Sequence, residues 1–151
     1  MMIALALARA VTTCMASHFY TFGGAIHRQE DGGAIGSDLT GDIARNVMSI
    51  WDLTFLKTLE SLGIIIDLYK RYVDDQLEIC PPINPGWKFC TKSKVMKYSS
   101  EEAINDRDSP AIRTAKVLQN VANSIEDCIK LTFDTPDRNA NEKMPVLDLE
   151  V

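Results

Sequence analysis

The sequence predicts an α+β fold with a mainly antiparallel sheet and helices packed on one face of it. Long segments place apolar residues three and four positions apart, as amphipathic helices do, and short segments place apolar runs around turn-forming residues. Of the 151 residues, 46% are hydrophobic and 25% are charged, which is ordinary for a globular protein with a core. The length fits one domain or part of a larger one.

The N-terminal part is expected to hold a helix, a short hairpin and a loop. Residues 3–17 are rich in Ala and Leu, which favour helix. Residues 19–27 carry aromatic and β-branched residues around a Gly-Gly pair, which indicates a short hairpin, or a strand and a turn. Residues 28–41 are polar and rich in glycine, as in a loop.

A long helix is predicted from about Asp42 to Leu62, because apolar residues recur there at spacings of mostly three and four. Gly63 is a plausible stop for this helix. Three residues just before it are candidate N-caps: Ser37, Asp38 and Thr40.

The second half is expected to add a hairpin, a connecting segment, a helix and two strands. The hairpin covers residues 64–80, and the connecting segment covers residues 80–109, with one short strand near Trp87. A helix begins at Ser109-Pro110, because proline suits the first helical position, and its spacing continues to Ile125. The remaining elements are a strand over 128–135, a polar turn over 136–143 and a strand over 144–151.

Charge and cysteine content exclude some classes of function. The net charge of −5 gives the chain no general attraction for nucleic acid, so such a role would depend on local charge. The four cysteines form no C-x-x-C pair and the two histidines complete no zinc pattern, so we expect reduced thiols and a reducing compartment. Arg9 interrupts the apolar N-terminal run, so we expect no signal peptide, no transmembrane segment, no membrane partner and an intracellular location.

Two adjacent acids stand between apolar runs in the stretch Lys70-Arg71-Tyr72-Val73-Asp74-Asp75-Gln76-Leu77-Glu78-Ile79. Taken alone, an Asp-Asp pair at a hairpin tip is more often a solvated turn, because Asp bonds readily to nearby backbone. The alternative is a metal site. Closely spaced carboxylates hold the divalent ions of phosphoryl transfer, which lie roughly 3.5–4 Å apart, and Mg²⁺ prefers such oxygen ligands.

The flanking residues favour the metal site. The tetrapeptide Tyr72-Val73-Asp74-Asp75 resembles the Y-x-D-D hairpin of reverse transcriptases. Upstream, residues 29–37 are similar to that family's Q-x-x-G-x-x-x-G-S loop, which precedes a long helix. Downstream, "IEDCIKLTF" and "MPVLDLEV" look like its next two elements. The likeness spans nearly the whole chain and is closest to the Penelope-like and related eukaryotic retroelements.

This resemblance implies a partial polymerase palm over residues 1–151. The implied activity is RNA-templated DNA synthesis from dNTPs with Mg²⁺ or Mn²⁺ as cofactor, and the implied partners are an RNA template and a DNA primer. Asp74 and Asp75 would be the catalytic metal ligands. The residues that would bind nucleotide or template are Tyr72, Gln29, Gly32, Gly36 and Ser37.

Two departures from the family pattern leave alternatives open. Asp38 stands where many members have a proline, and the upstream strand with the first metal-binding aspartate, the fingers and the thumb are expected to be absent. The isolated chain is therefore expected to be inactive without these missing segments of a parent polymerase. The alternatives are a non-enzymatic remnant of a mobile element, and a nucleic-acid-binding or interaction module with an incidental acidic turn.

A local basic cluster lies in the connecting segment, where lysines alternate with Trp87, Phe89 and Tyr98. Basic residues and aromatics together hold a nucleic-acid strand through its phosphates and by stacking on its bases. A solvated linker with ordinary lysines is an equally good interpretation. The candidate nucleic-acid contacts are Lys88, Lys92, Lys94 and Lys97.

Overall fold

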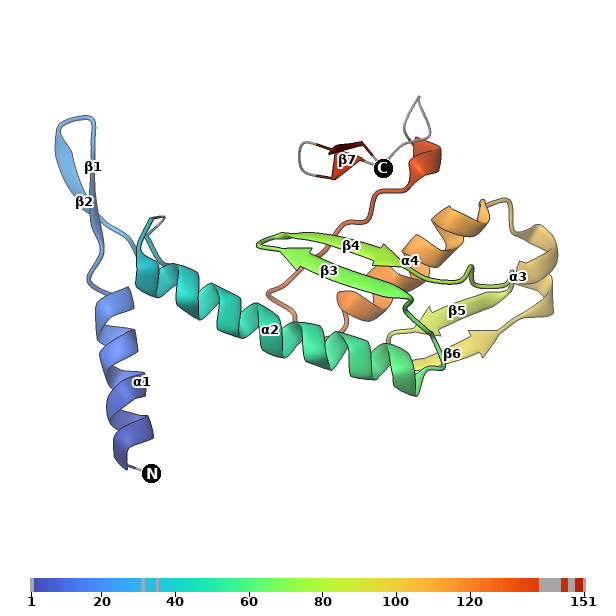
Figure 1. Ribbon diagram of the computed structural model, residues 1–151, viewed down its shortest axis with the longest axis horizontal. Helices are drawn as coiled ribbons and strands as arrows, with labels where there is room; N and C mark the ends of the chain where they lie inside the picture. The colour runs from blue at the N-terminus through green and yellow to red at the C-terminus, as the bar shows by residue number, and fades with distance from the viewer. Residues whose placement is uncertain (1, 31, 35, 139–144, 147–148, 151) are drawn as a thin grey trace. The chain divides into compact units, whose positions relative to one another are not determined.

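The computed structural model describes residues 2–30, 32–34, 36–138, 145–146 and 149–150 (Figure 1). The chain divides into two units, Met1–Ser49 and Ile50–Val151, and each is described by itself. Within the described residues the protein has four α-helices and four antiparallel strand pairs, which confirms the α+β class. The expected single sheet is not formed there, since each pair of strands is a separate two-stranded sheet.

The first unit begins with the expected helix and hairpin. Helix α1 covers Met2–Met15, and strands β1 (Phe19–Phe22) and β2 (Ala25–Arg28) pair across the two glycines. Both glycines of this turn have positive φ, 61° and 79°, a conformation that glycine adopts without a steric cost. Arg28 donates two hydrogen bonds to the Ala16 carbonyl, at 3.0 and 3.2 Å, and so ties the hairpin to the end of α1.

Helix α2 covers Asp38–Ser61 and begins four residues earlier than expected. The Ser37 carbonyl accepts the N–H of Gly41 at 3.1 Å, which places Ser37 at the N-cap. At the other end Gly63 has φ +74° and donates to Glu60, while Ile64 donates to Leu59. These two bonds make a Schellman motif and confirm Gly63 as the stop.

The second unit contains the predicted acidic hairpin. Strand β3 covers Leu68–Tyr72 and strand β4 covers Asp75–Ile79, in the register Leu68↔Ile79 to Tyr72↔Asp75. The turn between them has only two residues, Val73 and Asp74. The hairpin expected over 64–80 is therefore confirmed, with the acids at its tip.

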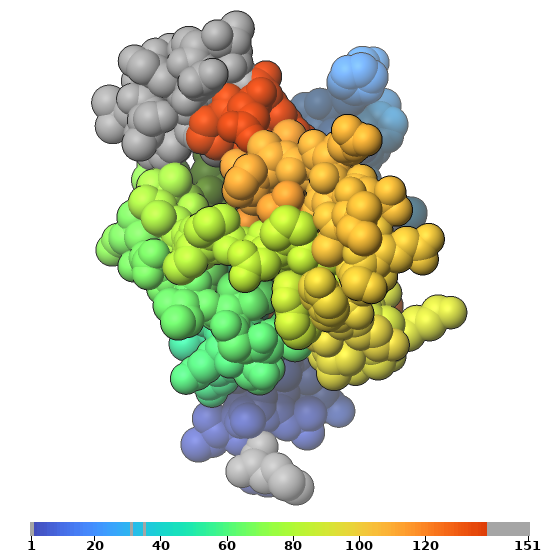
Figure 2. Space-filling model, turned by 90° about the vertical axis from the view of Figure 1, so that its right-hand side faces the viewer, coloured from blue at the N-terminus to red at the C-terminus, as the bar shows by residue number. Residues whose placement is uncertain are grey.

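The segment 80–109 was wrongly expected to be mostly a linker. It holds a second hairpin of β5 (Trp87–Cys90) and β6 (Val95–Tyr98), followed by helix α3 (Ser100–Asn105). Gly86 allows this arrangement because a Cβ there would lie 2.7 Å from the Ser99 carbonyl oxygen. Figure 2 shows this hairpin, α3 and the following helix α4 (Pro110–Ala122) side by side on one face of the second unit.

Helix α4 covers Pro110–Ala122 and begins as predicted. The Ser109 hydroxyl accepts the N–H of Ile112 at 3.2 Å, and Pro110 occupies the first turn. The helix ends three residues before Ile125, where Asn123 is the C-cap.

The strand expected over 128–135 is wrong, because this segment is irregular. Side chains of α4 and its C-cap take the place of a neighbouring strand. Asn123 accepts the N–H of Leu131 at 2.6 Å, and the Leu131 carbonyl accepts from Gln119 at 3.0 Å and from Asn123 at 3.1 Å. Both backbone groups of Leu131 are thus satisfied without a ladder.

The C-terminal elements also differ from expectation. A short 3-10 helix, Pro136–Arg138, occupies the start of the polar turn expected over 136–143. The rest of that turn and residue 144, where the next strand was expected to begin, lie outside the described residues. In place of one strand over 144–151, β7 (Pro145–Val146) and β8 (Leu149–Glu150) pair with each other.

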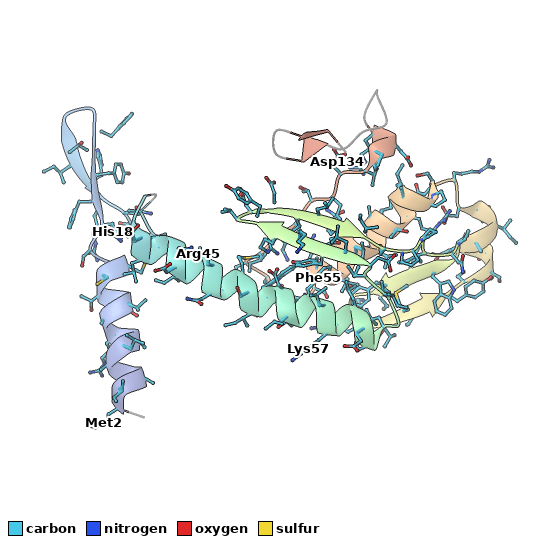
Figure 3. The ribbon with its side chains drawn as sticks, in the orientation of Figure 1. Met2, His18, Arg45, Phe55, Lys57 and Asp134 are labelled. Atoms are coloured by element: carbon cyan, nitrogen blue, oxygen red, sulfur yellow. The ribbon has the colours of Figure 1, made fainter. Side chains whose placement is uncertain are left out.

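The core of the second unit is formed mainly by α2 and α4. Trp51, Phe55 and Leu59 of α2 are buried at spacings of four, so they lie on one face of the helix. Figure 3 shows Phe55 between α2 and the β3–β4 hairpin, where its ring lies 6.2 Å from that of Tyr69. The buried residues contributed by the other elements are Phe89, Thr114, Val117, Leu118, Val121, Ala122 and Thr135.

Candidate functional site

The tip of the β3–β4 hairpin presents two carboxylates to solvent. Asp74 is the second turn residue and Asp75 is the first residue of β4, and both are exposed. Tyr72 pairs with Asp75 and is 63% exposed, so its ring stands beside the acids and not in the core. The tip therefore offers carboxylate oxygens and an aromatic ring to a ligand.

Val73 makes the turn conformationally unusual. Its φ is 55°, although a β-branched residue is rarely found at positive φ. A two-residue hairpin turn needs positive φ at its first central residue, because this matches the twist of the strands. The register of the hairpin thus imposes a strained backbone directly before Asp74.

An ion pair anchors the hairpin to α2 below this tip. Arg71 donates from Nε and Nη2 to the Asp52 carboxylate at 2.6–3.0 Å. The guanidinium also lies over the Trp51 ring, 5.4 Å from its centroid. Although burial disfavours the charged form, the hydrogen bonds to Asp52 raise the pKa of Arg71.

Tyr69 and Gln76 extend this pair into a network. The Tyr69 hydroxyl donates to Asp52 at 2.5 Å, and burial together with this bond raises the pKa of Tyr69. We assign the Gln76 amide with its oxygen toward Arg71, at 2.9 Å from Nη2, because its nitrogen then donates to the Tyr69 oxygen at 3.0 Å. In this orientation each donor has an acceptor.

Glu78 ends the network. The Gln76 amide nitrogen lies 3.1 Å from Oε1 of Glu78. The other carboxylate oxygen of Glu78, Oε2, is buried without a protein hydrogen-bond partner. Burial raises the pKa of Glu78 to about 7, and the charge of Arg71 opposes this shift. We call the five residues of this network the polar lock: Asp52, Tyr69, Arg71, Gln76 and Glu78.

The polar lock was missed from the sequence, although a signal for it exists. Tyr69 and Arg71 stand opposite Glu78 and Gln76 in the hairpin register, so all four share one face of the hairpin. Asp52 interrupts the apolar stretch Ile50–Phe55 next to the buried Trp51. A polar hairpin face and a lone acid in an apolar helix face together predict a buried ion pair.

A groove begins at the acidic tip and runs along β4. It has a volume of about 990 Å³, and its walls are β4, the N-terminal part of α4, the irregular segment 131–135 and the 3-10 helix that follows it. Asp74, Asp75 and Glu78 line it together with apolar side chains such as Leu118 and Phe133. Both acids of the tip thus belong to the lining of one groove.

The predicted nucleotide-binding loop lies in the first unit, and its position relative to the acidic tip stays a prediction. Gln29 donates its N–H to the His18 carbonyl at 2.9 Å. Gly32 and Gly36 have φ of 75° and 87°, which only glycine adopts readily. Ser37 caps α2 through its backbone, as described above, so its position has a structural reason as well.

Of the four lysines in the basic cluster, Lys88 and Lys97 lie in the strands of the β5–β6 hairpin, and Lys92 and Lys94 lie in its turn. Lys88 pairs with Lys97, and Trp87 pairs with Tyr98, in adjacent positions of the β5–β6 ladder. Since adjacent pairs point to opposite faces, the two lysines lie on the face away from the two aromatic rings. Lys88 also forms a 2.9 Å ion pair with Glu102, so a phosphate would have to compete for it.

The described part of the chain contains neither a cluster of metal-binding side chains nor a helix that could span a membrane. None of its His, Cys, Asp and Glu side chains form a group of three or more that would hold a metal ion. Asp74 and Asp75 are thus two carboxylate ligands that fit a hard divalent cation in type but are fewer than a complete ligand set. Likewise, no helix among the described residues has the length and apolar character needed to cross a bilayer.

Comparisons of the chain with protein-family models, with curated proteins and with solved structures found no significant match in any of the three.

Proposed function

We propose that this chain supplies the acidic, cation-binding hairpin of a reverse transcriptase-type, RNA-templated DNA polymerase, with Mg²⁺ or Mn²⁺ as cofactor. The observation that carries the proposal is the placement of the Y-V-D-D stretch. Its two acids are exposed at a two-residue hairpin tip and both line one groove. A solvated turn explains the exposure of the two acids but gives no reason for the neighbouring tyrosine.

Each residue of the tip has a role in this proposal. Asp74 and Asp75 provide oxygen ligands, and Tyr72 lines the site beside the incoming nucleotide or the primer end. When bound, divalent cations supply charge neutralisation for the triphosphate and the leaving group. The loop residues Gln29, Gly32, Gly36 and Ser37 would face the template and nucleotide. RNA template, DNA primer and dNTPs are the corresponding partners.

The first test is cation binding measured by calorimetric titration with Mn²⁺. We expect weak binding by the wild-type chain and at least severalfold weaker binding by Asp74→Asn, because two carboxylates attract a divalent cation but complete little of its shell. Asp127→Asn is a matched control, since Glu126 and Asp127, like Asp74 and Asp75, are adjacent and exposed acids. Equal binding by the wild type and Asp74→Asn would remove the tip from any cation site.

The second test is primer extension on an RNA template with Mg²⁺ or Mn²⁺. We expect no extension by the 151-residue chain alone. The chemistry depends on positioning, which accounts for roughly 7–11 kcal/mol of a barrier, and Asp74 and Asp75 are the only two metal-binding carboxylates that the resemblance implies in this chain. Extension that disappears in the Asp74→Asn, Asp75→Asn double variant would overturn this expectation and show that the chain is itself a polymerase.

A further inference from the structure

The β3–β4 hairpin needs an anchor to hold its tip in place. A two-stranded hairpin is at best marginally stable in water by itself, and the described strands of this one pair only with each other. The acids at its tip are exposed, so they contribute no packing. The position of the tip therefore depends on the hairpin face that lies against α2.

That face is held by an ion pair that is nearly excluded from water. The Arg71 side chain is 9% exposed and the Asp52 side chain is 19% exposed. The pair is bidentate, and the guanidinium also stacks on Trp51, so both the distance and the angle between hairpin and helix are fixed. Arg71 is separated from Asp74 by only two residues.

We propose that Arg71 is a positioning residue that locks the β3–β4 hairpin onto α2 and so fixes the tip carboxylates Asp74 and Asp75, and that ionisation of Glu78 weakens this lock. The consequence for cation binding rests on the proposed function, whereas the lock itself does not. Arg71 acts through the backbone of the hairpin and touches no ligand.

The role of Glu78 follows from its surroundings. Oε1 has the Gln76 amide, but the buried Oε2 has no protein donor, and Arg71 is already engaged by Asp52. An ionised Glu78 is therefore incompletely compensated, and an opened hairpin would return it to water. The charged or titratable groups around it are Arg71 and Tyr69 of β3, Asp52 of α2, Cys80 and Asp67 beside the strand ends, and Asp134 and Arg138 across the groove.

Amide hydrogen exchange tests the lock without any cation. In Arg71→Lys, which keeps the charge but loses the bidentate fork, we expect the opening constant of β3–β4 amides to rise about tenfold. Amides of α4 should stay unchanged. The matched control is Arg113→Lys, because Arg113 and Asp106 form a similarly buried pair, 12% and 15% exposed, away from this hairpin.

The lock is refuted if Arg71→Lys leaves the hairpin amides unchanged or if Arg113→Lys affects them equally. A second variant covers the case in which Arg71→Lys does not fold. Asp52→Leu combined with Arg71→Met replaces the pair with apolar groups, a change that buried ion pairs often tolerate. We expect this variant to fold, with protected α4 amides and faster exchange in β3–β4. Unchanged β3–β4 exchange in it would also refute the lock.

A pH profile tests Glu78. After correction for the intrinsic rate of exchange, the opening constant of β3–β4 in the wild type should rise about twentyfold between pH 5.5 and 7.5. The native state binds the proton more tightly than the opened one in this range, so opening becomes easier as the pH rises. Glu78→Gln should remove this dependence. The same slope in Glu78→Gln would refute the part assigned to Glu78.

Mn²⁺ titration then connects the lock to the tip. We expect Arg71→Lys to weaken Mn²⁺ binding severalfold while Arg113→Lys leaves it unchanged. If the wild type and Asp74→Asn bind equally, the proposed function fails, and the exchange measurements still decide the lock. If binding depends on Asp74 but neither exchange rates nor Mn²⁺ affinity respond to Arg71→Lys, the lock fails and the proposed function stands.

Discussion

The β3–β4 and β5–β6 hairpins of the second unit have strands of similar length, five and four residues, but differ in the charge of their turns and in the chemistry of their buried faces. The β3–β4 hairpin has an acidic tip, and its buried face is a polar network around Arg71. The β5–β6 hairpin has a basic turn, and its buried face is the ring of Phe89. Burial of an apolar side chain stabilises the contact between a hairpin and the core, but it allows small rotations of the hairpin. A bidentate ion pair fixes the orientation of the hairpin, although desolvation of the two charges costs free energy. The comparison indicates that the acidic hairpin is built for placement and the basic hairpin for stability.

Removing the aromatic anchor should have the largest effect. Phe89 is 7% exposed, so Phe89→Ala should lower the free energy of unfolding by about 3–5 kcal/mol through lost burial and a cavity. Tyr72→Ala, at the exposed tip of the other hairpin, should change it by at most about 0.5 kcal/mol. Urea unfolding followed by far-UV circular dichroism measures both. Equal losses would show that the two hairpins are not anchored differently.

The next effect is the pH dependence of stability due to Glu78. Its pKa is raised from the usual 4.5 to about 7, so the stabilising contribution is fully present below pH 4.5 and is lost as the pH rises through 7. We expect this group to lower the free energy of unfolding by up to about 3 kcal/mol between these limits. Glu78→Gln should therefore be more stable than the wild type at pH 8 and similar to it at pH 4.5. Urea unfolding at four pH values tests this, and a wild type that is the more stable protein at pH 8 would contradict it.

Local signals in the sequence predicted most elements of the fold. Glycines at positive φ mark the β1–β2 turn and the end of α2, and Ser109-Pro110 marks the start of α4. Each of these turns and helix ends is determined by residues within a few positions of it, so it can be predicted from the sequence. Val73 shows the limit of such signals, because the register of the whole hairpin overrides its own preference.

The predictions from sequence that were wrong concern elements whose structure depends on contacts between residues far apart in the chain. Leu131 is held by Asn123 and Gln119, whose side chains replace a strand partner, and no periodicity of residues 128–135 reveals that. The same holds at the candidate site. Adjacent acids between apolar runs predicted the exposed tip, but the pairing of Asp52 with Arg71, nineteen residues apart, depends on how the hairpin lies on α2.

Relief of backbone strain in the two turns should raise the free energy of unfolding, by less than the loss expected for Phe89→Ala. Both hairpins place a residue other than glycine at positive φ in the turn, Val73 at 55° and Lys94 at 52°. Glycine has no steric cost there, so Val73→Gly should raise the free energy of unfolding by about 1 kcal/mol and Lys94→Gly by about half as much. The difference arises because Val is β-branched and Lys is not. Thermal unfolding of both variants measures it, and destabilisation by Val73→Gly would mean that the Val73 side chain has a packing role.

The smallest effect concerns the like charges across β5–β6. Lys88 and Lys97 are direct neighbours in the ladder, and only Lys88 has an ion pair, with Glu102. Lys97→Glu would turn the cross-strand repulsion into attraction, which should raise the free energy of unfolding by about 0.2–0.5 kcal/mol at low salt. Because the groups are exposed, the gain should vanish near 1 M NaCl, where the Debye length is about 3 Å.

The matched control is Lys92→Glu, which changes the net charge equally but lies in the turn and not opposite Lys88. If the two variants gain equally, the effect comes from the local excess of positive charge on this hairpin and not from the Lys88–Lys97 pair. If neither gains, Lys88 is already neutralised by Glu102, and this face of the hairpin has little positive potential to offer a nucleic acid.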